Sequence, residues 1–249
     1  MIYIKKQEVP PVVFTQAIQG LNNYDELRPP NRDTVTDLLL KEQGGLCAIC
    51  ERKYKSEEGK IHFGATIEHF LPKSIFPNKQ LHYHNLYVAC AACNGPKGSH
   101  LIPAYIFDSR FSPNFPFNAG TKPIYTLKDG KCYVEVMNMD KNTYTTPEHH
   151  NAHLLQVTLD LLQQNRYSET SKYPETSSLT FQRAVVFKAI MARLKSLPEA
   201  EIRRKFENIQ RNTTLIHDGV TSEPPYPEYP EFISLIAYLF YIRLGGRTT

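Results

Sequence analysis

The 249-residue chain has no hydrophobic run long enough to cross a membrane. Its longest apolar stretch, residues 232–244, is about a dozen residues long and contains Ser234 and Arg243, whereas a bilayer-spanning helix needs roughly 20 apolar residues. The first residues place charges directly after a short apolar stretch and show no small-residue cleavage site, so no secretory signal is indicated. We therefore expect a cytoplasmic protein without a membrane span.

A strong excess of charge of either sign is also missing. Lys and Arg number 29 and Asp and Glu number 25, which leaves a net charge of +4. Hydrophobic residues make up 41% of the chain, which excludes the disordered and fibrous classes and allows one large or two small cores. We find no internal repeat. The mild basic excess permits binding of nucleic acid but does not require it.

Cysteine is scarce, but its spacing is informative. Four of the five cysteines form two Cys-x-x-Cys pairs, Cys47 with Cys50 and Cys90 with Cys93, and Cys132 is left over. A two-residue gap lets both sulfurs of a pair bind one metal ion at about 2.3 Å. The two pairs predict a closed structural zinc site. The alternative is a redox dithiol, which needs one pair and usually a thioredoxin-like βαβ context that this sequence lacks.

Periodicity and turn residues predict an α+β protein. In the first half we expect a strand at residues 2–4, helices at 12–18 and 34–43, and strands within 61–67 and 86–89. Asn31 or Asp33 can cap the second helix, and Gly44-Gly45 can end it. In the second half we expect an irregular connector at 101–120, a hairpin of residues 124–127 and 132–136, helices at 151–165, 179–197, 199–212 and 231–244, and a proline-rich, non-helical segment at 223–230.

Residues suited to catalysis lie between and just after the cysteine pairs. Glu68 and His69 are adjacent at the expected end of the first strand, Asn85 precedes the second strand, and Asn94 follows the second cysteine pair. Neighbouring side chains in a regular strand point to opposite faces, so we expect the strand to end at His69. Pro72 supports this end because it forces the residue before it out of helical conformation.

On these residues, the segment of about residues 45–100 resembles an HNH endonuclease of the zinc-stapled ββα-metal type. Glu68-His69 matches the first motif element, Asn85 the second and Asn94 the third. The wider layout is similar to the HNH subunit of retron-associated and Septu-type (PtuB-like) antiphage defence systems: Tyr-Ile-Lys-Lys at residues 3–6, Lys-Glu-Gln-Gly-Gly-Leu-Cys at 41–47, and a helical second half.

The resemblance implies a role for each motif residue. His69 is the expected general base, because a neutral imidazole can remove a proton from water near pH 7. Glu68 and Asn94 are the expected oxygen ligands of a catalytic Mg²⁺ or Mn²⁺. Asn94 stands where the family often has histidine, which favours these hard cations over softer metals. Asn85 is expected to hold the loop and orient His69.

Less specific interpretations stay open for several of these residues. Lys73 and Lys97 flank the expected site and are candidates to bind the substrate backbone, or they are solvated lysines. Asn94 can instead cap a following helix. A Glu-His pair such as Glu68-His69 can be surface decoration. We interpret His62, His82 and His84 as non-catalytic. The cluster of His149, His150 and His153 could suggest a second metal site, but we interpret it as incidental.

The expected helices of the second half leave two further alternatives. Residues 183–211 carry eight basic and three acidic side chains, which form either a solvated face or a phosphate-facing surface. The segment 231–244 is apolar nearly all round and is either core or a partner interface. We divide the chain into a lead-in at residues 1–44, a nuclease core at 45–110, and a hairpin with helices at 111–249.

The resemblance predicts a metal-dependent endonuclease that hydrolyses phosphodiester bonds. DNA is the expected substrate, with RNA such as tRNA as the alternative. The defence-system likeness implies a gating ATPase subunit (PtuA-like) and, in a retron setting, a reverse transcriptase with its DNA or RNA product. The competing hypotheses are a stand-alone HNH restriction-type endonuclease and an inactive zinc-knuckle protein that only binds nucleic acid.

Overall fold

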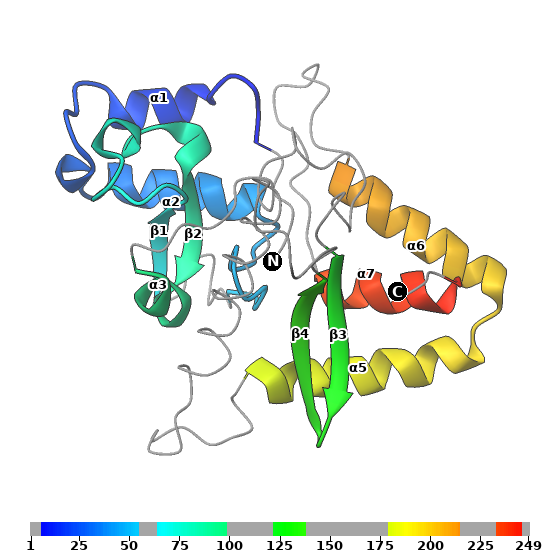
Figure 1. Cartoon of the computed structure of the whole chain (residues 1–249). Helices are drawn as coiled ribbons and strands as arrows, with labels where there is room; N and C mark the ends of the chain where they lie inside the picture. The colour runs from blue at the N-terminus through cyan, green and yellow to red at the C-terminus, as the bar shows by residue number, and fades with distance from the viewer. Residues whose placement is uncertain (1–5, 55–63, 99–121, 138–178, 215–232, 246–249) are drawn as a thin grey trace, which may run out of the picture.

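The structure, a computed structural model, describes residues 6–54, 64–98, 122–137, 179–214 and 233–245. It is a mixture of helices and two small antiparallel sheets of two strands each, which confirms the expected α+β class (Figure 1). The expected elements at residues 2–4, 101–120, 151–165 and 223–230 lie outside the described residues.

Two helices form the N-terminal layer. Helix α1 (Val12–Ile18) has the bounds expected from the sequence, and α2 (Asn31–Glu42) packs against it and against the first sheet. A 3-10 turn, η1 (Tyr24–Glu26), lies between them. The expected capping of α2 by Asn31 or Asp33 is wrong. Asn31 is already the first helical residue, so Pro30 is the N-cap, and no side chain caps the helix. The expected end is confirmed, with φ of 63° at Gly44 and 76° at Gly45.

The first sheet and the helix after it form a strand–strand–helix unit. Strand β1 (Ala65–His69) pairs antiparallel with β2 (Leu86–Cys90), with Ala65 opposite Cys90 and His69 opposite Leu86. Helix α3 (Ala91–Lys97) follows β2 directly and packs against both strands. The turns η2 (Pro77–Lys79) and η3 (Tyr83–Asn85) lie in the connection between the strands. As expected, β1 ends at His69.

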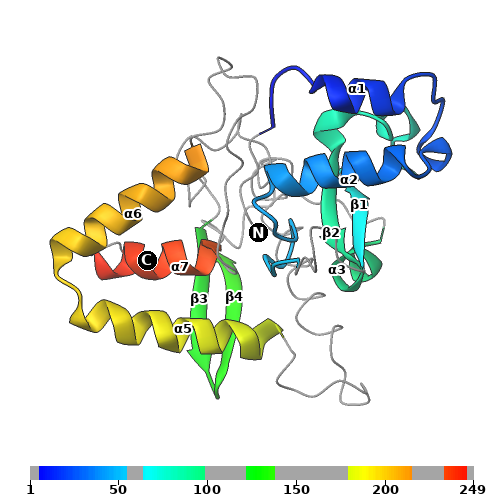
Figure 2. The ribbon, with the colours of Figure 1, turned by 180° about the vertical axis from the view of Figure 1, so that it is seen from behind.

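A hairpin and three helices form the other half of the molecule. Strands β3 (Lys122–Lys128) and β4 (Lys131–Met137) turn at Asp129 and Gly130, whose φ angles are 50° and 75°. Helix α5 (Leu179–Ser196) packs against β4, and α7 (Ile233–Arg243) packs against α5, α6 (Glu199–Thr214) and β3, as Figure 2 shows from behind. The hairpin and these three helices confirm the prediction to within two residues at each end.

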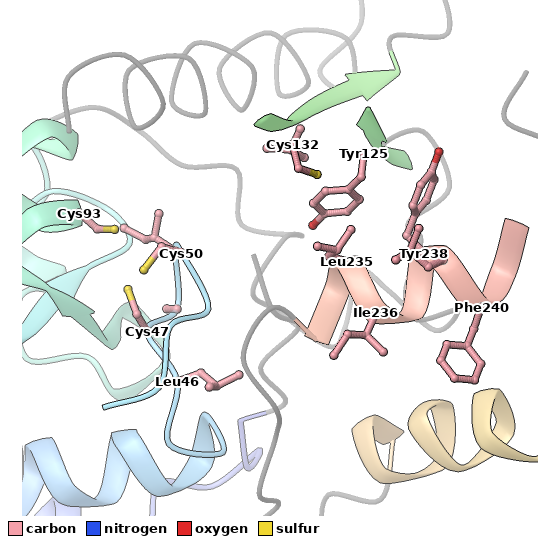
Figure 3. Close-up of a cluster of buried hydrophobic side chains, with 14 of the residues drawn as sticks. Leu46, Cys47, Cys50, Cys93, Tyr125, Cys132, Leu235, Ile236, Tyr238 and Phe240 are labelled. Carbon is pink, nitrogen blue, oxygen red and sulfur yellow. The ribbon is translucent and has the colours of Figure 1, made fainter. Parts of the chain in front are cut away.

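Two hydrophobic clusters hold these elements together. One joins α1, α2 and the first sheet through Phe14, Leu39 and Leu86. The other joins the segment of Cys47 and Cys50 to the hairpin and to α5, α6 and α7 (Figure 3). Helix α7 contributes buried side chains to it, which favours the core interpretation of this apolar helix. No helix in the described ranges is both long and apolar enough to span a membrane.

Candidate functional site

The four paired cysteines converge on one point. Cys47 and Cys50 lie in the turn after α2, Cys90 ends β2, and Cys93 lies in α3. Their sulfur atoms all lie within 4.8 Å of one another, and the Sγ atoms of Cys50 and Cys90 are 3.9 Å apart. Figure 3 shows the sulfurs of Cys47, Cys50 and Cys93 facing one another. A tetrahedral zinc ion needs sulfur–sulfur distances of roughly 3.8 Å, so the cluster can hold zinc.

Buried hydrogen bonds fix this cluster. The Gln43 side chain accepts a bond from the Val88 amide at 2.7 Å and donates to the Val88 and Leu46 carbonyls at 2.9 and 2.8 Å. It therefore ties the end of α2 to the cysteine turn and to β2. The Cys90 amide donates to the Cys47 sulfur at 3.3 Å. A separate side-chain hydrogen bond between the two cysteines lowers the pKa of the Cys90 thiol to about 6.

The fifth cysteine, Cys132, is not part of the cluster. It is a fully buried residue of β4. Burial raises the pKa of its thiol to about 11. A thiol with such a pKa is a packing group rather than a nucleophile.

His69 is buried at the end of β1 in a defined orientation. Its Nε2 lies 3.0 Å from the backbone oxygen of Gln80. Because a carbonyl only accepts hydrogen bonds, Nε2 carries the proton and the lone pair of the neutral ring is on Nδ1. Burial lowers the pKa of His69, although the bond to Gln80 acts in the opposite direction. The lowered pKa favours a neutral His69 ring at neutral pH, and its role as general base stays a prediction.

Asn85 fixes the loop that presents the Gln80 carbonyl. Its Oδ1 accepts a bond from the Leu71 amide at 2.6 Å, and its Nδ2 donates to the Leu71 and Lys79 carbonyls at 3.0 Å each. Asn85 is buried, and its own carbonyl accepts from Phe70 at 2.8 Å. These bonds join both ends of the loop next to His69, and the orienting role of Asn85 stays a prediction.

Glu68 forms a buried ion pair with Lys97. The Nζ atom of Lys97 contacts Glu68 Oε1 and also donates to the backbone oxygen of His69 at 3.0 Å. Lys97 is only 1% exposed and Glu68 8%. Burial raises the pKa of the Glu68 carboxyl, and the charge of Lys97 opposes that shift. The structure thus places Lys97 inside the site as the partner of Glu68, and its predicted contact with substrate stays a prediction.

Asn94 lies on the same side of β1 as Glu68. Its Nδ2 donates to the Thr66 hydroxyl at 3.0 Å, and residues two apart in a strand, such as Thr66 and Glu68, share a face. The alternative of a helix cap is wrong, because Cys90 is the N-cap of α3 and Asn94 lies in the middle of that helix. A carboxylate and an amide oxygen are donors that suit a hard divalent cation, so this pair fits Mg²⁺ or Mn²⁺.

The remaining candidates lie at the edge of the site or outside it. Lys73 is partly exposed and pairs with Asp25 at 2.6 Å, and its role with substrate stays a prediction. His84 bonds to the Gln7 carbonyl at 2.9 Å, and this bond involves neither Glu68 nor Asn94. His82 lies in the same loop. Four further histidines lie outside the described residues: His62, His149, His150 and His153.

Sequence reasoning missed Tyr24, Gln43 and Gln80. The ring of Tyr24 packs edge-on to the His69 ring, with centroids 4.6 Å apart, and its amide donates to the Gln80 side chain at 3.2 Å. These contacts join segments far apart in the chain, and no local pattern marks such residues. Gln43 lies in the stretch at residues 41–47 that belongs to the family likeness, but nothing in that stretch indicates what its side chain contacts.

The fold and site define an α+β protein in which one two-stranded sheet carries both a buried Glu-His pair and part of a four-cysteine cluster. The chain is similar to the Septu protein PtuB of Bacillus thuringiensis, with 37% identity over 113 residues that cover 41% of this chain and 40% of that relative. The chain thus matches about two fifths of the relative's length. No protein-family model matches the chain.

Proposed function

We propose that this chain is a metal-dependent endonuclease of the HNH type and the effector nuclease of a Septu-type antiphage defence system. The observation that carries the proposal is the orientation of His69, whose buried ring bonds through Nε2 to the Gln80 carbonyl and leaves Nδ1 as the nitrogen that can accept a proton. The strand–strand–helix unit with its cysteine cluster supports a ββα-metal core. The likeness to a Septu protein supports the defence role.

The residues provide the parts that phosphodiester hydrolysis needs. Nδ1 of His69 accepts the proton of the attacking water, which makes that water a nucleophile at neutral pH. The Gln80 carbonyl keeps the other ring nitrogen protonated and holds the ring in place. Asn85 holds the loop that carries this carbonyl, so its contribution to the reaction is positional.

Glu68 and Asn94 would hold the divalent cation. When bound there, Mg²⁺ or Mn²⁺ stabilises the negative charge that develops on the phosphoryl and leaving oxygens. Lys97 keeps Glu68 oriented and compensates its charge inside the protein. By joining the helix that carries Asn94 to the strand that carries Glu68, Lys97 also fixes the spacing of the two oxygen donors. Zinc in the cysteine cluster would be structural, because four thiolates leave no open position.

Nucleic acid is the proposed substrate, with DNA as the first expectation and tRNA as the alternative. A phosphate-facing surface is supported by exposed basic side chains on α5 and α6: Lys188, Arg193, Lys195, Arg203 and Arg204. Of these, Arg203 also pairs with Glu199 at 3.0 Å. We further propose a PtuA-like ATPase as the gating partner, and in a retron setting the reverse transcriptase with its nucleic-acid product.

The test is cleavage of supercoiled plasmid, and separately of bulk tRNA, by purified protein with Mg²⁺ or Mn²⁺. His69→Ala should lower the cleavage rate at least about a hundredfold, because it removes the general base. His84→Ala is the matched control, since it removes an imidazole from the neighbouring loop and should cleave like the wild type. Equal cleavage by His69→Ala and wild type would contradict the proposal.

The same assay separates the competing functions. High activity of the isolated chain would favour a stand-alone restriction-type enzyme, and weak activity that rises with an ATPase partner would favour the gated effector. Binding of nucleic acid without any cleavage, with or without the partner, would favour the inactive zinc-knuckle protein.

A further inference from the structure

A residue of the N-terminal segment, Tyr24, contacts the candidate site although it is not one of the motif residues. Tyr24, in the turn before α2, packs its ring against His69 with a centroid distance of 4.6 Å and an interplanar angle of 82°. Its amide donates to the side chain of Gln80, whose backbone oxygen accepts the bond from His69. Tyr24 therefore contacts both the imidazole and the residue that orients it.

The hydroxyl of Tyr24 contacts Arg32. Burial raises the pKa of Tyr24, and the guanidinium of Arg32, which hydrogen bonds to the hydroxyl, opposes that shift. The nearby charge of Glu68 acts on the same hydroxyl. Arg32 lies in the first turn of α2, which packs against β1, and its side chain is partly exposed. Arg32 is thus a half-buried cation that is linked to His69 through Tyr24.

The basic side chains around His69 differ in the groups that they contact. Among the residues that the structure describes, Lys97 pairs with Glu68, and Lys73 pairs with Asp25 while its ammonium also lies 5.1 Å from the Tyr24 ring. Arg32 contacts a neutral hydroxyl instead, so its positive charge is not compensated by that contact. A planar guanidinium fixed by one hydrogen bond is well suited to bind two oxygens of a phosphate group.

We propose that Arg32, held by the hydroxyl of Tyr24, is a binding subsite for the phosphate group at the cleaved bond, and that the ring of Tyr24 positions His69. The inference rests on the proposed nuclease function, which requires a phosphate beside His69 and Glu68. It adds to that function a substrate-binding residue and a positioning residue from outside the cysteine-bounded segment. A merely structural Tyr24–Arg32 contact would stabilise the fold without affecting the binding of nucleic acid.

The test measures binding separately from cleavage. Anisotropy of a short fluorescent duplex DNA, and of labelled tRNA, is titrated with full-length protein over a range of salt concentrations, with Ca²⁺ in place of Mg²⁺ to suppress turnover. Arg32→Gln should weaken binding about tenfold and lower the slope of log affinity against log salt by about one, as loss of one phosphate contact does. Arg28→Gln is the matched control, because it removes the same charge from an exposed residue shortly before α2 and should leave both values unchanged.

The Tyr24 variants separate its two roles. Tyr24→Phe keeps the ring against His69 but frees Arg32, so it should weaken binding and leave the single-turnover cleavage rate at saturating protein within about twofold of wild type. Tyr24→Leu removes the ring as well and should lower that rate about tenfold, as loss of a supporting contact does. Thermal unfolding and zinc content of each variant establish that it is folded.

Each outcome decides the inference. If Arg32→Gln binds with the affinity and salt slope of Arg28→Gln, or if wild-type protein binds neither probe, Arg32 is not a phosphate subsite. If Tyr24→Leu cleaves at the rate of Tyr24→Phe, Tyr24 does not position His69. Wild-type protein that binds both probes with the expected Arg32 effect, but cleaves neither with or without an ATPase partner, would remove the nuclease proposal and leave Arg32 as a phosphate contact only.

Discussion

At the scale of single residues, the buried pair of Glu68 and Lys97 is the contact on which the site depends most. It joins the end of β1 to the end of α3, and Lys97 also bonds to the backbone of His69. A buried carboxylate that loses its cation is an uncompensated charge in a medium of low polarity. The pair of Lys73 and Asp25 has similar chemistry, but both partners are solvated and screened.

Replacing Lys97 with methionine should therefore lower the free energy of unfolding by about 3–5 kcal/mol, as loss of one partner of a buried ion pair does. The double variant Glu68→Gln with Lys97→Met should recover part of that loss, because no charge is left buried. Lys73→Met is the matched control and should change stability too little to resolve. Urea unfolding at neutral pH measures all three, and equal losses for Lys97→Met and Lys73→Met would show that the buried pair is not formed.

The residues that bear chemistry could be predicted at this scale, and their partners could not. Two short cysteine spacings and the order of Glu68, His69, Asn85 and Asn94 are local features of the sequence. The burial of Lys97 depends on how α3 packs against β1. Nothing in the residues next to Lys97 in the sequence distinguishes it from Lys73. The sequence therefore predicts that both lysines flank the site.

At the scale of elements, Gln43 is the joint between α2, the cysteine turn and β2. Its side chain makes three hydrogen bonds, two with the backbone of Val88 and one with the Leu46 carbonyl. The Ala48 amide adds a bond to the same Val88 carbonyl at 3.0 Å. The turn that carries Cys47 and Cys50 is thereby placed against the strand that ends at Cys90.

Gln43→Leu keeps the volume of this side chain but leaves buried backbone groups without their partner. We expect it to lower the free energy of unfolding by about 2–4 kcal/mol and to speed the release of zinc to a chromogenic chelator. Gln16→Leu, on the exposed face of α1, should change stability by less than about 0.5 kcal/mol and leave zinc release unchanged. Zinc release at the wild-type rate from Gln43→Leu would show that the cysteine turn does not depend on this joint.

The bounds of the described elements were predictable wherever local signals are strong. The hairpin around Asp129-Gly130, the helix that ends before Pro198 and the end of α2 at Gly44-Gly45 follow from turn and helix-stop residues. The start of α2 was predicted wrongly, because Asn31 and Asp33 are good caps by type but Pro30 takes that position. Capping depends on the path of the preceding chain, which type alone does not determine.

At the scale of the whole molecule, segments from both halves share one hydrophobic cluster. Buried residues of the cysteine turn, the hairpin and helices α5, α6 and α7 belong to it, whereas α1 and α2 pack with the first sheet in another. The strand–strand–helix unit lies between the two clusters and contributes to both. The candidate site is thus supported from both sides by elements that lie outside the segment bounded by the cysteines, which its motifs did not reveal.

The central claim, a nuclease site in which zinc is structural and a second metal is catalytic, is tested most directly by removing and restoring the weakly held metal. Wild-type protein is passed through metal-free buffer, and its zinc content is measured. Cleavage of plasmid and of tRNA is then assayed, together with any ATPase partner. The protein should retain its thiolate-bound zinc and lose cleavage. Added Mg²⁺ or Mn²⁺ should restore cleavage in the wild type but not in His69→Ala. Cleavage that persists without added metal while zinc is retained, or that returns equally in His69→Ala, would contradict the account.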